Sequence, residues 1–113
     1  MMKKYALFFY INQKLLNENT NDGLKLEYLN DWHHWISGLK ESTCLENGNH
    51  FSTKAKVLHS DGSETLGPFL NQELSIAGFL IISCADIESA SKYAQKCPIL
   101  KGEGNRVEVR EIA

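Results

Sequence analysis

The pattern of hydrophobic and polar positions picks out two segments that are apolar at every position. Residues 5–11 read YALFFYI and residues 76–82 read IAGFLII. A strand that is buried on both faces has such a pattern, whereas a strand with one face in water alternates. We therefore expect these segments to be central strands of a sheet, the second of them beginning near Leu74.

Two other segments carry apolar residues at helical spacing. In residues 24–41 the apolar positions recur every three or four residues, which predicts an amphipathic helix. The members of this stripe are Leu24, Tyr28, Leu29, Trp32, Trp35, Ile36 and Leu39. A second, narrower stripe of small residues follows Asp86, a residue suited to cap a helix, and we expect Pro98 to end that helix at Cys97.

The segments between these elements are more polar. Residues 12–23 are rich in Asn and predict an exposed loop, and residues 42–51 contain an Asn-Gly-Asn run that predicts a connection. Residues 53–59 alternate and predict a half-exposed second strand. An Asp-Gly pair then predicts a hairpin turn into a short return at residues 63–66, which a Gly-Pro pair ends.

A last strand is predicted at residues 106–112, where Val107 and Val109 share one face. Three charged residues share its other face, as edge protection or cross-strand ion pairs. The order strand, helix, strand, strand, helix, strand is the ferredoxin-like α+β plan, an antiparallel sheet with both helices on one face. In this plan the first and third strands are central, and these are the continuously apolar ones. We expect residues 1–113 to form a single domain of this kind.

Helices on one face leave the other face of the sheet without a cover. Successive side chains of the first strand point to opposite faces, so one set faces away from the helices. Both sets are apolar, Tyr5, Leu7, Phe9 and Ile11 on one face and Ala6, Phe8 and Tyr10 on the other. Leaving either set in water costs roughly 25 cal/mol for each Å² of apolar surface. We therefore predict a homodimer joined through the open faces of two sheets.

The composition excludes some classes of function. Of the 113 residues 42% are hydrophobic, and the formal net charge is -2 with acidic and basic residues mixed along the chain. This balance provides no basic surface for nucleic acid and no polybasic membrane anchor. The apolar start of the chain is short for a signal sequence and no cleavage site of small residues follows, so we favour a first strand there and expect no membrane association.

The three cysteines, Cys44, Cys84 and Cys97, are an odd number at wide spacing. They match neither a disulfide framework nor a CxxC metal or redox motif, which predicts a reduced, cytoplasmic protein. The Gly-Glu-Gly run at residues 102–104 predicts a turn rather than a phosphate loop, because it follows no strand and opens no helix. We therefore expect no metal and no cofactor.

Several short motifs stand in a fixed order along nearly the whole chain. They are Trp32 and Trp35, Gly67-Pro68-Phe69, Ala77-Gly78-Phe79, Cys97-Pro98-Ile99-Leu100 and Val107-Glu108-Val109-Arg110. In this order they resemble the YCII-related family, in the branch often called DGPF-domain proteins. The resemblance implies a dimeric α+β barrel, which agrees with the open sheet face deduced from the strand pattern.

The resemblance also implies a pocket between the first helix and the sheet, binding a small aromatic or unsaturated organic acid with possible proton-transfer chemistry such as elimination or isomerisation. The expected ligand-binding residues are Trp32, Trp35, Phe69 and Tyr10, and the expected base is His33. The alternative is a non-catalytic binding or interaction module that keeps the family fold. Leu66, Asn71 and Leu74 favour this alternative, because they stand where the family has acidic residues.

Other interpretations of these side chains follow from the sequence alone. His33 and His34 are adjacent on the helix and point about 100° apart, so they do not chelate one ion as an i, i+4 pair would. Both can be solvated, and the two tryptophans lie on the apolar stripe, where core packing is the simplest role. A site made of His33, His50 and His59 would require the fold to bring them together.

Overall fold

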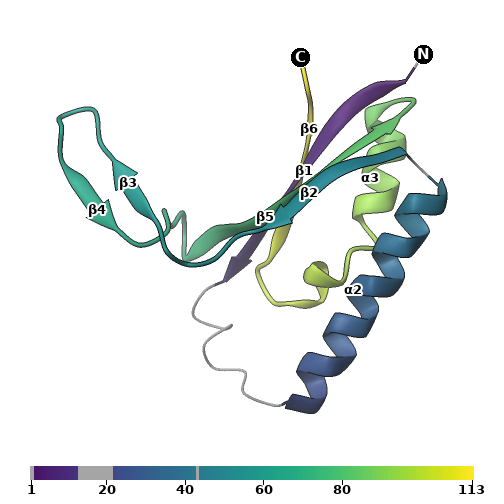
Figure 1. The fold of residues 1–113 in the computed structure, drawn as a ribbon, viewed down its shortest axis with the longest axis horizontal. Coiled ribbons are helices and arrows are strands. Elements are labelled where there is room, and N and C mark those ends of the chain that lie inside the picture. Colours follow the sequence, from purple (N-terminus) through teal and green to yellow (C-terminus); the bar gives the residue numbers. More distant parts are fainter. Residues whose placement is uncertain (1, 13–21, 43) are drawn as a thin grey trace.

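The computed structural model describes residues 2–12, 22–42 and 44–113. Its elements are β1 (Lys3–Asn12), α2 (Asp22–Ser42), β2 (Cys44–His50), β3 (Lys56–Leu58), β4 (Glu64–Leu66), β5 (Leu74–Cys84), α3 (Ile87–Ala94), the 3₁₀ helix η1 (Pro98–Lys101) and β6 (Arg106–Glu111). Four strands form an antiparallel sheet in the order β2-β5-β1-β6, and both helices lie on one of its faces (Figure 1). The predicted ferredoxin-like α+β fold is confirmed, with the two apolar strands β1 and β5 at its centre.

The second strand of this sheet corrects the sequence analysis. The connection predicted at residues 42–51 is wrong, because β2 occupies Cys44–His50 and pairs with β5. Gly48 lies within this ladder opposite Leu80, where a Cβ would come within 2.2 Å of Leu80 Cδ2 and 2.9 Å of the Phe79 carbonyl oxygen. The glycine therefore permits a close approach of two strands rather than a reversal of the chain.

The predicted second strand belongs to a separate hairpin. Among the described residues β3 and β4 pair with each other alone, and their hairpin projects from the end of the main sheet away from the helices (Figure 1). Its turn lies at the Asp-Gly pair as predicted: Asp61 accepts hydrogen bonds from the backbone N–H and hydroxyl of Ser63, and Gly62 has a φ of 91°. Gly67, also with a φ of 91°, follows the end of β4. We call residues 51–73 the arm.

The arm makes the molecule extended. The Cα radius of gyration is 15.4 Å, whereas a compact chain of this length has about 13 Å. Several large apolar side chains of the arm are exposed, namely Phe51, Leu58, Leu66, Phe69 and Leu70.

The core lies between the sheet and the helices. Tyr5, Leu7 and Phe9 of β1 and Leu80 and Ile82 of β5 face the helices and are buried. The helical layer covers them with Trp35, Leu39, Ala90, Ala94, Cys97 and Ile99. One face of each central strand is therefore covered by the helices, and the other is not (Figure 1).

The second helix begins as predicted. Asp86 caps it, with a carboxylate oxygen that accepts a hydrogen bond from the Ser89 N–H at 2.8 Å. The helix ends at Ala94, three residues before the predicted end, and Pro98 instead opens η1. Most of the loop predicted at residues 12–23 lies outside the described residues.

Candidate functional site

The open face of the sheet has an apolar centre. Because paired residues of neighbouring strands share a face, the register identifies its side chains. The central strands contribute Ala6, Phe8, Tyr10, Ile76, Phe79 and Ile81. Phe51 of the arm extends this surface, since its ring centroid lies 5.8 Å from that of Phe79. We call Ala6, Phe8, Phe51, Ile76, Phe79 and Ile81 the open-face patch.

The two edge strands give this face polar borders. β2 contributes Asn47 and Asn49, which lie opposite Ile81 and Phe79. β6 contributes Arg106, Glu108 and Arg110, so the alternation predicted for the last strand is confirmed. An apolar centre with a polar rim is the usual anatomy of a protein–protein interface.

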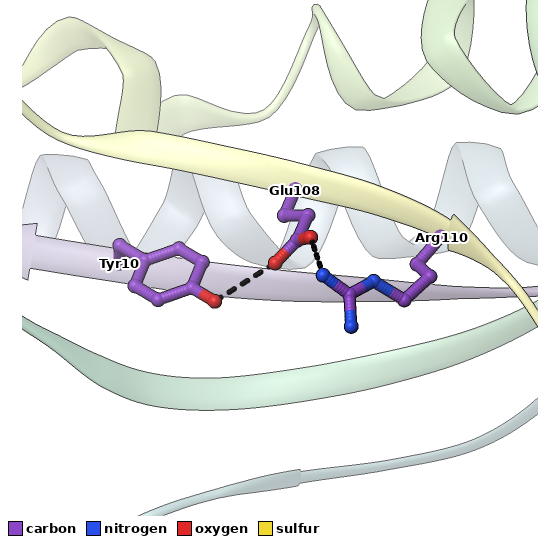
Figure 2. Close-up of polar contacts among 3 residues, drawn as sticks. All are labelled: Tyr10, Glu108 and Arg110. Atoms are coloured by element: carbon purple, nitrogen blue, oxygen red, sulfur yellow. Dashed lines mark hydrogen bonds and ion pairs between the residues drawn. The ribbon is translucent and has the colours of Figure 1, made fainter.

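A hydrogen-bonded group lies on the β6 border (Figure 2). Tyr10 Oη donates to Glu108 Oε1 at 2.9 Å, diagonally across the two strands, and the Arg110 guanidinium pairs with the other carboxylate oxygen. The hydrogen bond from Tyr10 holds the pKa of Glu108 below its ordinary value, and Arg110 adds to this effect. Desolvation, together with the bond to Glu108, raises the pKa of Tyr10. The Tyr10 hydroxyl and the two charges of the Glu108–Arg110 pair therefore all have a bonding partner within the group.

The two tryptophans of α2 fill the layer between the helix and the sheet. The Trp32 and Trp35 rings pack edge-to-face against Phe9, with centroid distances of 5.2 and 6.0 Å, and lie 5.4 Å from each other. Trp35 Nε1 also donates to the Tyr93 carbonyl oxygen at 3.0 Å, which ties α2 to α3. These contacts confirm the core-packing role that the apolar stripe predicted for the two tryptophans.

The structure brings together some of the predicted site residues and separates others. Trp32 and Trp35 lie side by side on the helical face of the sheet, whereas Tyr10 lies on the open face and Phe69 is 68% exposed on the arm. His33 is exposed on α2. Its role as a base stays a prediction, as does a ligand-binding role for the four aromatic residues.

An open groove lies between α2 and the segment from α3 to η1. It has a volume of about 360 Å³, and its lining includes the aromatic rings of Trp35 and Tyr93 and the basic side chains of His34, Lys96 and Lys101. At its border Lys101 Nζ pairs with Asp31 Oδ2 at 3.0 Å. Sequence reasoning missed Tyr93 and Lys96. The available signal was Tyr93 itself, a large aromatic residue in a helix whose buried stripe is otherwise small.

A metal site and a membrane-spanning helix are both absent from the part of the chain that the structure describes. There, no group of three or more His, Cys, Asp or Glu side chains is arranged to hold a metal ion. Within the same residues, no helix combines the length and the apolar character needed to cross a membrane. Burial raises the pKa of the Cys97 thiol to about 12, so this thiol stays protonated at neutral pH.

Comparison with protein-family models gives no match for this chain, and comparison with curated proteins gives no significant match. The resemblance to the YCII-related family therefore stays a prediction that rests on the motifs. Each motif has a local structural role here. The tryptophan pair packs α2, the Gly-Pro-Phe motif ends β4, and the Ala-Gly-Phe motif lies in β5. The Cys-Pro motif opens η1, and the Val-Glu-Val-Arg motif lies in β6.

Proposed function

We propose that this protein is a binding module that works as a homodimer, joined through the open faces of two sheets. The observation that carries the proposal is the open-face patch, which lies on the two central strands and the start of the arm, on the face that the helices do not cover (Figure 1). Within one chain Ala6 is buried and Phe8, Phe79 and Ile81 are half-buried. Its Ile76 is 41% exposed and its Phe51 is 43% exposed. Monomeric proteins rarely leave a contiguous apolar patch of more than a few hundred Å² in water.

The polar border suits the same interface. Tyr10, Glu108 and Arg110 already satisfy one another (Figure 2), so an approaching surface can remove water from them without leaving a charge unpaired. The layer between α2 and the sheet is filled by aromatic rings. This packing supports binding at a surface over chemistry inside the domain.

The homodimer is tested with two substitutions of matched chemistry. Ile76 in the patch and Ile87 at the start of α3 are 41% and 42% exposed, and each is replaced by Glu. Sedimentation velocity should show that Ile76→Glu shifts the protein to monomer, because a charge would have to be buried at the interface. Ile87→Glu should leave the dimer unchanged. Equal behaviour of the two variants would contradict the proposed interface.

A second candidate function is the binding of a small organic acid, and the groove beside α2 favours it. Tyr93 lines the groove as a half-buried ring, Trp35 lines it with the small part of its side chain that is not buried, and Lys96 supplies a cation that forms none of the ion pairs found between described residues. An aromatic carboxylate would pack against Tyr93 and place its charge near the ammonium group. This site uses one residue expected from the sequence, Trp35, and lies on the outer side of the helical layer.

Titration of tryptophan fluorescence with benzoate and cinnamate tests this second candidate. Binding should be saturable, and Lys96→Gln should weaken it about tenfold because a charge-assisted hydrogen bond is lost. Lys92→Gln is the matched control, since Lys92 lies exposed on α3, one turn before Lys96, and does not line the groove. The absence of saturable quenching in the wild-type protein would rule out these ligands.

We further propose a cytoplasmic location. The buried thiols of Cys84 and Cys97 support a reducing compartment, because neither forms a disulfide. Mass spectrometry of the protein purified without reductant should find all cysteines alkylatable after denaturation. A disulfide in that sample would contradict this location.

A further inference from the structure

We propose that the arm, residues 51–73, is a clasp that packs against a second copy of this chain, with Leu58 and Leu66 as its main contacts. The inference rests on the proposed homodimer and adds a second contact surface to it. Two observations carry the inference: the hairpin presents two highly exposed leucines on one face, and the arm begins beside the open-face patch.

The register of the hairpin places its two leucines on one face, together with a paired lysine and glutamate. Lys56 pairs with Leu66 and Leu58 pairs with Glu64, so both leucines point to the same side. They are 72% and 80% exposed, the highest values among the large apolar side chains described. Between them Lys56 Nζ pairs with Glu64 Oε2 at 3.3 Å, which neutralises the two charges on this face.

On the opposite side of the hairpin, the polar side chains bond each other. Thr65 lies on that side, and its hydroxyl bonds His59 Nε2 at 2.7 Å. Val57, opposite Thr65, is half-buried. Among the paired residues of β3 and β4, only the leucine face therefore presents large exposed apolar side chains.

The arm is held in a defined direction at its base. Asn71 and Leu74 exchange two backbone hydrogen bonds of 2.9 and 3.0 Å around a tight turn. Gln72 and Glu73 adopt φ values of 53° and 69° in this turn, a conformation that is uncommon for residues other than glycine. Gly67 N–H bonds the Ala55 carbonyl oxygen at 2.9 Å and joins the two sides of the arm.

A hairpin with so short a ladder is not stable by its own contacts. β3 and β4 are three residues each, and an isolated two-stranded hairpin is marginal in water at best. Packing its leucine face against another surface would supply the missing stabilisation. Among the described residues of the same chain no surface covers that face, since both leucines remain exposed.

Continuity with the open-face patch indicates that the second surface belongs to another copy. The arm leaves the main sheet at the ends of β2 and β5 (Figure 1). Its first residue, Phe51, packs beside Phe79 of the patch, so an interface on the open face would reach the base of the arm. Two-fold symmetry would place the arm of each chain beside the other chain and apply each contact twice.

The test compares two double variants that each replace exposed leucines with serine. Leu58→Ser with Leu66→Ser alters the arm, and Leu29→Ser with Leu100→Ser alters the helical layer, where the two side chains are 53% and 40% exposed. The arm variant should raise the dissociation constant of the dimer about 100-fold or more by sedimentation equilibrium, because burial of four leucines is lost. The helical variant should stay within threefold of the wild type.

The outcomes separate the clasp from the homodimer itself. If Ile76→Glu dissociates the dimer and the arm variant does not, the clasp is overturned and the homodimer stands. If the wild-type protein is monomeric, both are overturned. Amide exchange gives a second measurement: the arm should be more protected at concentrations above the dissociation constant than below it, and equal protection would overturn the clasp.

Discussion

The pairing of β2 with β5 makes a sharp prediction for one glycine. Gly78 lies opposite His50, and a Cβ added there would stand 2.5 Å from the Asn49 carbonyl oxygen and 3.3 Å from His50 Cα. Both atoms belong to the backbone of β2, so no flexible side chain can move aside. To restore an ordinary contact of 3.4 Å, β2 would have to shift by about 0.9 Å. Such a shift stretches a typical ladder bond beyond hydrogen-bonding distance.

Two opposing terms set the size of the effect of Gly78→Ala. Restricting the unfolded chain stabilises the folded state by about 0.4–1 kcal/mol, and overpacking costs about 1–3 kcal/mol. We expect a net loss of about 1–2 kcal/mol in the free energy of unfolding. Gly38→Ala is the matched control, because Gly38 lies inside α2 with nothing within 4 Å of its added Cβ. This substitution should stabilise the protein by up to about 1 kcal/mol.

Urea unfolding followed by far-UV circular dichroism and tryptophan fluorescence measures both variants. All samples need the same protein concentration, because dissociation of a dimer would contribute to the transition. The two substitutions make the same chemical change and should have opposite signs. A Gly78→Ala protein as stable as the wild type would refute the close approach of β2 to β5, and with it the corrected position of the second strand.

Two further predictions follow from local geometry. The pKa of Glu108 is lowered in the folded state, so the stability that this carboxylate contributes is present at neutral pH and is lost as the pH falls below the ordinary pKa of 4.5. The difference in unfolding free energy between wild type and Glu108→Gln should therefore shrink from pH 7 to pH 3.5. A constant difference would contradict the bonding in Figure 2. The double substitution Gln72→Asn and Glu73→Gly should raise the free energy of unfolding by about 1 kcal/mol, because Asn and Gly tolerate the positive φ of this turn. A loss of stability in urea unfolding would contradict the turn conformation described above.

The features that the sequence predicted correctly are those set by burial pattern. The apolar runs of β1 and β5 marked the central strands, and the alternation of Val107 and Val109 marked the inner face of β6. Asp86 marked the start of α3 because a capping residue acts within its own turn. Each of these signals is local or depends on one face of one element.

The features that were missed depend on a partner that the sequence does not display. β2 is held by the backbone of β5, and among its residues with described side chains Leu45 alone packs against the core cluster. Its Asn-Gly-Asn run therefore predicted a connection instead of a strand. The hairpin strands were assigned to the main sheet because their alternation does not reveal which strand they pair with.

The candidate site was harder to predict for the same reason. Tyr10 lies in a predicted strand and Trp32 in a predicted helix, yet the sheet separates the two side chains. Trp32 packs against Phe9, and Tyr10 and Phe9 point to opposite faces of β1. Phe69 lies on the arm, whose direction depends on the turn at residues 71–74. Residue types alone do not show which face of the sheet a side chain occupies or in which direction the arm leaves the sheet.

The mass of the wild-type protein in solution tests the central proposal most directly. One chain has a mass of 12.8 kDa. Light scattering coupled to size-exclusion chromatography, over loading concentrations of about 1–100 µM, should give twice that mass and a shift to monomer for Ile76→Glu. A mass of one chain throughout this range would contradict a homodimer joined through the open face of the sheet.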